Sequence, residues 1–279
     1  MRIILKRLSV LLAGMLFIAT AGVLAGIRFN DSVDTGASSD DVISYDISSV
    51  KRYLKDSYDN ITDLKENASY ILTYNGNYVK NYSQTILNDY YNNRDGVDSN
   101  DVTGTCTIVA TLGMVNYYGN IRKEGTYGYS DGDAFVKIMD GCLDEGYTTR
   151  RSGTSKSKVN NCLSEAFDQY SISRGGNTEW YYLESKIRDF VDSKHPVIFD
   201  VSNHSTVAVG YTSYTFKYTE TYTTGTLWWK KTKTRTSSTT KKFIIVNEGW
   251  GYRNAGSLID CDKIGNITDS MQICYAEKD

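Results

Sequence analysis

The chain has 279 residues, of which 40% are hydrophobic and 23% are charged, so it is long enough for one globular domain with additional segments. Its net charge of −2 gives no overall electrostatic argument for nucleic acid or for an anionic surface, and we expect no nucleic-acid partner. The chain has two histidines, His195 and His204, so a catalytic site that needs an imidazole has two candidates.

The first 25 residues have the pattern of an export signal. Arg2, Lys6 and Arg7 form a basic start, and residues 8–25 carry no charge and end in small residues. This uncharged stretch of 18 residues also approaches the length of a membrane-spanning helix. We therefore expect a secreted or surface-exposed protein in which residues 1–25 are a signal peptide. In the alternative, residues 8–25 are an uncleaved anchor, and only then is the membrane a partner.

Residues 26–95 form an N-terminal region that ends in a turn-rich boundary. The stretch "YNNRDGVDSNDVTG" (residues 91–104) has turn chemistry throughout. Before it, apolar side chains recur at helical spacing: Val50, Tyr53 and Leu54, then Ile61 and Leu64, then Ile71 and Leu72. Two interpretations stay open. The region is either the N-terminal part of the following domain or a pro-segment that covers an active site until it is removed.

Four helices are predicted after this boundary. The first, residues 106–118, is apolar on nearly every side, so we expect it to be buried. Three further helices are expected at residues 133–143, 156–170 and 179–192, where apolar side chains recur at intervals of three and four.

The pattern then changes to strands. "PVIFDVS" (residues 196–202) and "STVAVGY" (residues 205–211) are typical of buried strands. Residues 212–242 alternate threonine or lysine with aromatic residues, which predicts a long exposed hairpin that turns at Thr224 and Gly225. "KKFIIVNEGWG" then returns the chain to the core, and "AGSLID" adds a short strand. Helices followed by antiparallel strands indicate an α+β catalytic domain at residues 96–279, with 212–242 as an inserted hairpin.

The chain has five cysteines, so at least one thiol of an exported protein has no partner in the same chain. Apart from Cys106, the cysteines allow two disulfides in three pairings: Cys142, Cys162, Cys261 and Cys274. The sequence has no C-x-x-C spacing and no close pair of histidines. We therefore expect neither a metal nor another cofactor.

Three separated side chains suggest nucleophilic catalysis. Cys106 opens the apolar helix, where the helix dipole and an adjacent imidazolium lower the pKa of a thiol. His204 lies where one buried strand gives way to the next, and Asn247 ends the strand at residues 243–246. The amide of Asn247 is expected to accept a hydrogen bond from the imidazole, which turns the other ring nitrogen toward the sulfur. Trp250 is expected to lie over this pair and exclude water.

Each of these residues also has a purely structural interpretation. Cys106 is then a small core residue, His204 a hydrogen-bonded residue at a strand end, and "NEGWG" an ordinary turn. The other histidine, His195, precedes Pro196 at a helix-to-strand turn and is expected to be solvated.

In chain order, this cysteine, histidine and asparagine resemble those of the papain-like cysteine peptidases. "VTGTCTIVATLGMVNYYGN", "HSTVAVGY" and "FIIVNEGWGYRNAGSLID" are similar to the nucleophile helix, histidine strand and asparagine corner of exported bacterial branches, namely the streptopain-like enzymes and the peptidases that process bacteriocin leaders. The resemblance implies that Cys106 is the nucleophile, His204 the general base and acid, and Asn247 the residue that orients it. It also implies an oxyanion donor six residues before the cysteine, where Asn100 stands in place of the usual glutamine.

The expected activity is hydrolysis of peptide bonds in a peptide or protein substrate through a thioester on Cys106. Two alternatives stay open. The same site is used by cell-wall amidases and acyl transferases, and an inert papain-like scaffold could present the 212–242 hairpin as a surface-binding element. Asn203, His204 and Ser205 also form a glycosylation sequon. Because a glycan there would block the histidine, we expect a bacterial exported protein.

Overall fold

The computed structural model describes residues 43–94, 102–173, 184–201, 204–226, 228–249, 256–264 and 273–274. The expected signal peptide, the lead-in to residue 42, Asn100 and Trp250 lie outside the described residues. In the described ranges, no helix is both long enough and apolar enough to cross a membrane.

The centre of the molecule is an antiparallel sheet in the order β1-β10-β9-β8-β7-β11, and β2 pairs with β8 outside this path. Its strands are β1 (Ile43–Ser44), β2 (Asp59–Ile71), β7 (Val197–Val201), β8 (His204–Thr224), β9 (Lys231–Asn247), β10 (Ser257–Asp260) and β11 (Ile273–Cys274). Two small hairpins lie apart from it: β3 (Thr73–Tyr74) with β4 (Asn77–Tyr78), and β5 (Thr148–Thr149) with β6 (Gly153–Thr154).

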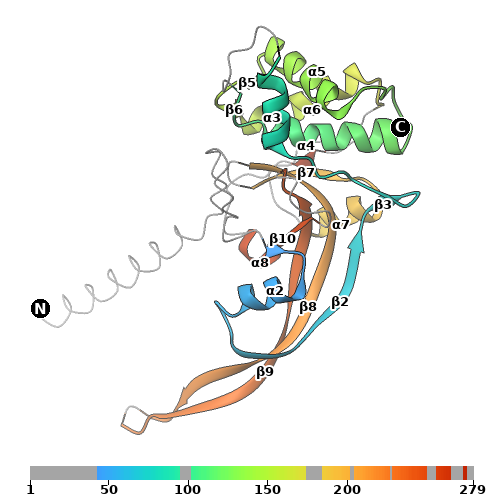
Figure 1. Ribbon diagram of the computed structural model, residues 1–279. Helices are drawn as coiled ribbons and strands as arrows, with labels where there is room; N and C mark the ends of the chain where they lie inside the picture. Colours follow the sequence, from blue (N-terminus) through green and yellow to red (C-terminus); the bar gives the residue numbers. More distant parts are fainter. Residues whose placement is uncertain are drawn as a thin grey trace, which may run out of the picture.

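The helices gather mainly at one end of this sheet, as Figure 1 shows. They are α2 (Ile47–Leu54), α3 (Gln84–Asn92), α4 (Cys106–Val115), the π-helical segment η1 (Asn116–Ile121), α5 (Asp131–Asp144), the short 3₁₀ segment η2 (Lys156–Lys158), α6 (Val159–Gln169), α7 (Glu184–Asp192) and α8 (Cys261–Ile264). The predicted α+β class is therefore confirmed, and the four helices and the strands predicted after residue 100 are present. Only part of the last predicted helix is described, because residues 179–183 lie outside the described ranges.

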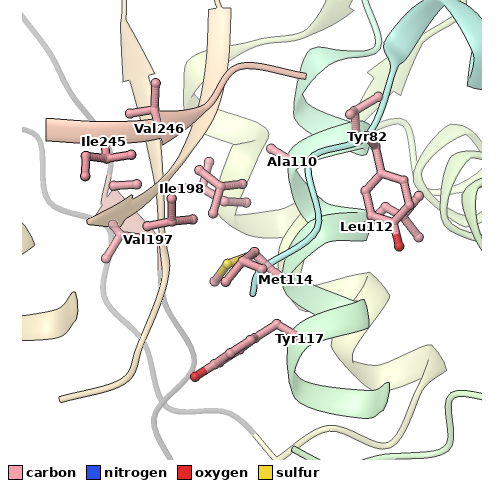
Figure 2. Close-up of a cluster of buried hydrophobic side chains, with 14 of the residues drawn as sticks. Tyr82, Ala110, Leu112, Met114, Tyr117, Val197, Ile198, Ile245 and Val246 are labelled. Carbon is pink, nitrogen blue, oxygen red and sulfur yellow. The ribbon is translucent and has the colours of Figure 1, made fainter. Parts of the chain in front are cut away.

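All ten residues of helix α4 are buried. It is apolar around its circumference because the sheet covers one side and helices α5 and α6 cover the other. Figure 2 shows Met114 between this helix and the side chains of Val197 and Ile198 on β7, with Ile245 and Val246 of β9 nearby. The C-terminal half of α4 is thereby packed against the sheet.

The helical spacing noted at Ile61 and Leu64 does not correspond to a helix, because residues 59–71 form strand β2. β2 pairs with β8 from Asp59 opposite Thr219 to Ile71 opposite Gly210, with register shifts along the way. Asn60 and Asp63 have positive φ angles of 49° and 52°, which interrupt the strand and produce an apolar spacing unlike that of a regular strand. Pairing with the long strand β8 therefore outweighed the local helical pattern.

Residues 43–94 share one hydrophobic core with the rest of the chain. The buried members from this region include Val50, Leu54, Ile61, Leu72, Leu87 and Tyr91. Tyr91 packs edge-on against Phe135 of α5 at 6.4 Å, and its hydroxyl donates to Asp140 at 2.5 Å. This region is a structural part of the folded unit.

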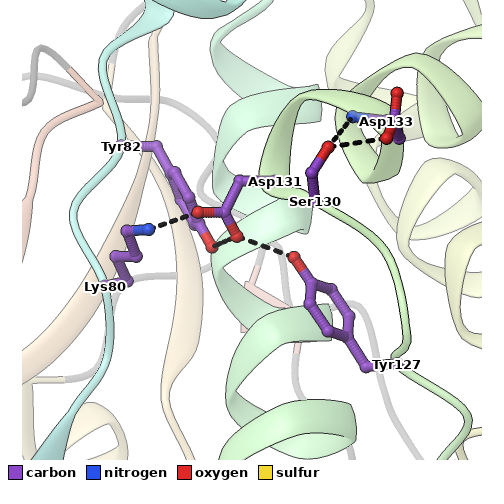
Figure 3. Close-up of polar contacts among 6 residues, drawn as sticks. All are labelled: Lys80, Tyr82, Tyr127, Ser130, Asp131 and Asp133. Carbon is purple, nitrogen blue, oxygen red and sulfur yellow. Dashed lines mark hydrogen bonds and ion pairs between the residues drawn. The ribbon is translucent and has the colours of Figure 1, made fainter.

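A polar cluster fixes residues 80–82 to the start of α5, as Figure 3 shows. Asp131, the first residue of α5, accepts hydrogen bonds from Lys80 and from the hydroxyls of Tyr82 and Tyr127, both at 2.8 Å. Burial by itself raises the pKa of Asp131. The three hydrogen-bond donors and the charge of Lys80 together lower it by more, so the net shift of the pKa is downward. Ser130 completes the junction by accepting a hydrogen bond from the backbone N–H of Asp133 at 3.2 Å, as a helix cap.

Two of the cysteines are in contact across helices α5 and α6. The Cys142 thiol donates to the carbonyl oxygen of Cys162 at 3.9 Å, and contact with the Cys162 thiol, followed by burial, raises the pKa of Cys142. Cys261 follows β10, and Cys274 lies on β11, which is separated from β10 by β9, β8 and β7 in the strand order.

Candidate functional site

Cys106 is the first residue of α4 and is buried, with 6% of its surface exposed. The residue before it, Thr105, makes no side-chain cap to the helix, because its hydroxyl donates to the amide oxygen of Asn88 at 2.6 Å. The first backbone N–H groups of the helix are therefore not satisfied by the side chain that usually caps them. Such an end favours negative charge on a nearby sulfur or oxygen.

The loop that delivers Cys106 is held by the hairpin of β5 and β6. Thr103 makes two bonds to this hairpin: its N–H donates to Arg150 O at 2.7 Å and its hydroxyl to Arg151 O at 3.0 Å. Gly104 has a φ of +67° and lies against Gly153, where an added Cβ would stand 3.1 Å from the nitrogen of Gly153. Two glycines thus allow the two backbones to approach directly beside the helix start.

His204 begins β8 and has 3% of its surface exposed. Its Nε2 lies 2.7 Å from the main-chain carbonyl oxygen of Glu248. Because a carbonyl oxygen only accepts, Nε2 carries the hydrogen, and Nδ1 is the basic nitrogen of the neutral ring. Burial lowers the pKa of His204 to about 4, although the bond to Glu248 opposes this shift. The imidazole is therefore neutral at pH 7 and able to accept a proton.

Cys106 and His204 come to the same end of the contact between α4 and β8. The next residue after each of them takes part in one buried hydrogen bond, between Thr107 Oγ1 and Ser205 Oγ at 2.8 Å. Further along both elements, a Cβ on Gly113 would stand 3.8 Å from Val207. Helix α4 and strand β8 therefore run alongside each other from this end. Cys106 directly precedes Thr107 on the helix, and His204 directly precedes Ser205 on the strand.

Asn247 ends β9 and is 7% exposed, opposite Val207 in the register. Its side-chain amide donates to the carbonyl oxygen of Val79 at 3.0 Å. The carbonyl oxygen that accepts from Nε2 of His204 belongs to the residue that follows Asn247, Glu248. The chain turns after Asn247, so a backbone group holds the ring in the position expected of the amide.

Residues 79–84, here called the crossing segment, run over the end of β9. Besides the bond from Asn247 to Val79, the N–H of Gly249 donates to Asn81 Oδ1 at 3.2 Å and the N–H of Gln84 to Gly249 O at 2.6 Å. Sequence analysis missed Asn81 and Glu248 as contributors. No local signal identifies them, because Asn81 and Gly249 lie 168 residues apart in the chain.

His195 is not the solvated turn residue that was expected. It is half-buried, its Nδ1 lies 2.9 Å from the hydroxyl of Tyr118, and the two rings stack. Tyr118 is 12 residues beyond Cys106 in a continuous helix, or roughly 18 Å along its axis. His195 is thus at the far end of that helix, which leaves His204 as the imidazole near its start.

Comparisons with protein-family models, curated proteins and solved structures find no match. In the part of the chain that the structure describes, no group of three or more His, Cys, Asp or Glu side chains could hold a metal ion. The described arrangement can transfer a proton to the buried, neutral imidazole of His204. The proton donor is the thiol of Cys106, the first residue of the apolar helix α4.

Proposed function

We propose that this chain is an exported cysteine peptidase of papain-like fold, in which Cys106 is the nucleophile and His204 the general base and acid. The observation that carries the proposal is the hydrogen bond between Thr107 and Ser205, because it joins the residues that follow the cysteine and the histidine. The resemblance of the three sequence stretches to papain-like enzymes supports the substrate class, and the pattern of residues 1–25 supports export.

The proposed mechanism starts from a neutral pair. Nδ1 of His204 takes the proton of the Cys106 thiol, and the N-terminus of α4 stabilises the thiolate. The sulfur attacks the peptide carbonyl, and the backbone N–H of Cys106 with the side-chain amide of Asn100 would donate to the oxyanion. His204 then protonates the leaving amine, and water activated by the same imidazole releases the acid from the thioester.

In this mechanism the carbonyl of Glu248 fixes the tautomer of the base. Because its hydrogen bond keeps the ring proton on Nε2, the lone pair of Nδ1 remains the one that accepts the thiol proton. Asn247 acts through its backbone connection to Glu248 and through its bond to the crossing segment. It is therefore proposed as a positioning residue.

The test uses a chain that begins at residue 26 and so keeps every described residue. Casein and a peptide library are the substrates, and iodoacetamide is the thiol probe, mapped by mass spectrometry. We expect Cys106→Ala to lower the rate of cleavage by roughly 10⁴-fold or more, since nucleophile removal in related chemistry has effects of that order. We also expect iodoacetamide to modify Cys106 in the folded protein faster at higher pH.

The matched control is Cys261→Ala, which removes another buried cysteine and should leave the activity unchanged. Equal cleavage by the Cys106→Ala and unsubstituted chains would contradict the proposal. If the protein cleaved purified peptidoglycan but no peptide, Cys106 would remain the proposed nucleophile, but the proposed substrate class would be wrong.

A further inference from the structure

The hairpin of β8 and β9 extends well beyond the sheet that supports it, as Figure 1 shows. β2 pairs with β8 only as far as Asp59 opposite Thr219, whereas β8 and β9 stay paired to Thr224 opposite Lys231. Residues 220–235, here called the arm, are therefore a ribbon of two strands and a turn. A two-stranded ribbon is marginal in stability without a packed face, and none of the described residues of the arm lies in the hydrophobic core.

The turn of the arm presents two neighbouring indoles to solvent. Trp228 is 87% exposed and Trp229 is 77% exposed. Gly225 at the turn has a φ of +118°, and an added Cβ would stand 1.8 Å from the carbonyl of Trp229, so the turn has a fixed geometry that only glycine permits. Because these indoles contribute little buried area, they do not stabilise the fold that carries them.

The charge of the arm is opposite to that of the remaining chain. Residues 220–235 contain four basic residues and one acidic residue, Glu220, although the whole chain has a net charge of −2. Glu220 is already bonded to Arg235 at 2.5 Å. Among the described residues, none forms an ion pair with Lys230, Lys231 or Lys233, three exposed lysines that directly follow the indoles in the chain.

We propose that the arm docks on an anionic lipid bilayer, with Trp228 and Trp229 entering the headgroup region and Lys230, Lys231 and Lys233 contacting the lipid phosphates. Tryptophan prefers the boundary between water and hydrocarbon, and lysines beside it are attracted by anionic headgroups. This inference does not depend on the proposed peptidase activity.

The geometry favours a bilayer over a protein partner. Exposed aromatic residues bind proteins most tightly when the rim of a shared interface excludes water from them, whereas these lie at the end of a narrow ribbon. The five residues of β8 beyond the last β2 pair span about 17 Å, which is longer than the screening length of about 8 Å at physiological ionic strength. The negatively charged body can therefore remain outside the strong field of the surface that the arm contacts.

Flotation with vesicles tests this proposal. The chain begins at residue 26, because residues 8–25 are apolar enough to bind lipid by themselves. One set of vesicles contains phosphatidylglycerol and phosphatidylcholine in equal parts, and the other contains phosphatidylcholine alone. We expect flotation with the anionic set, a much weaker effect with the neutral set, and release by added salt.

Two variants separate the contributions of the arm. Replacement of Lys230, Lys231 and Lys233 by serine should weaken partitioning into the anionic vesicles by roughly 100-fold, since each lysine adds a favourable increment near such a surface. Replacement of Trp228 and Trp229 by alanine should weaken it by about tenfold or more, because the buried apolar area is lost.

The matched controls replace exposed lysines and an exposed aromatic residue outside the arm. Lys51, Lys55 and Lys65 are exposed lysines of the N-terminal region, and their replacement by serine should leave flotation unchanged. Tyr78→Ala removes another exposed aromatic, at 59% exposure, and should behave likewise. Absence of binding to anionic vesicles, equal loss in the lysine controls, or tryptophan-dependent binding to purified peptidoglycan without vesicle binding would each overturn the proposal.

Discussion

At the scale of single residues, His204 combines a buried side chain with a hydrogen bond to an uncharged carbonyl oxygen. Burial disfavours the imidazolium, and the carbonyl restores only part of the lost solvation. The ring is therefore neutral in the resting protein. Its protonation during the proposed reaction would be stabilised by the thiolate that forms at the same moment.

The depressed pKa of His204 predicts how stability depends on pH. The unfolded histidine titrates near 6.5 and the folded one near 4, so between these values the unfolded state binds more protons. Stability is therefore full above the unfolded pKa and falls as the pH drops from about 6.5 to about 4. The loss over the whole window is roughly 3 kcal/mol.

Urea unfolding in the Cys106→Ala background measures this effect without self-cleavage. We expect the free energy of unfolding to be about 2 kcal/mol lower at pH 5 than at pH 7.5, and His204→Gln to abolish most of that difference. His195→Gln should retain it, because His204 is still present. An unchanged pH dependence in His204→Gln would show that other groups control it.

At the scale of elements, the small hairpin of β5 and β6 positions the nucleophile helix through backbone contacts. The bonds from Thr103 to Arg150 and Arg151 and the close approach of Gly104 to Gly153 lie within three residues of Cys106. A shift of this hairpin would therefore move the start of α4. The contact is independent of the side chains of the proposed catalytic pair.

Two glycines with similar backbone angles allow this to be tested. Gly153 has a φ of +70°, and an added Cβ would stand 2.3 Å from Gly104 O, whereas Gly146 has a φ of +65° with nothing within 4 Å. Gly146→Ala should cost only the left-handed strain of about 1–2 kcal/mol in unfolding free energy. Gly153→Ala should cost more and also change the rate at which iodoacetamide modifies Cys106.

Unfolding free energy and the alkylation rate are measured on both variants under conditions where each is fully folded. If Gly146→Ala and Gly153→Ala had the same stability and the same Cys106 reactivity, the hairpin would have no positioning effect on the helix.

At the scale of the whole molecule, residues 43–94 and the later helices and strands share one hydrophobic core. Strand β2 covers β8, Tyr91 packs on Phe135, and the crossing segment bonds to Asn247 and Gly249. Asp131 adds a polar connection to Lys80 and Tyr82. These contacts favour the interpretation of residues 43–94 as part of the domain.

Removal of this region is therefore expected to prevent folding. A chain that begins at residue 96 should lack a cooperative urea transition, because deletion exposes the apolar surface on which β2 and α3 pack. A chain that begins at residue 43 should retain the transition, and residues 26–95 supplied as a separate fragment should restore it to the shorter chain. Cooperative unfolding of the chain that begins at residue 96, without the fragment, would instead identify a removable pro-segment.

The sequence by itself determined the elements whose burial is uniform or strictly periodic. The apolar helix at Cys106, the amphipathic helices after it and the alternating hairpin at residues 212–242 followed from the period of their side chains. It also indicated which cysteine and histidine to consider, since Cys106 opens a helix and His204 begins a strand.

Only the tertiary structure decided the features that depend on distant backbone groups. Residues 59–71 form strand β2, despite their helical spacing, because they pair with β8. The hydrogen-bond partner of His204 is the carbonyl of Glu248 because the chain turns after Asn247. Backbone carbonyls are the same at every residue, so no side-chain pattern identifies which of them will face an imidazole 44 residues away. Periodicity records how each segment is buried, whereas such contacts arise only when separate segments pack together.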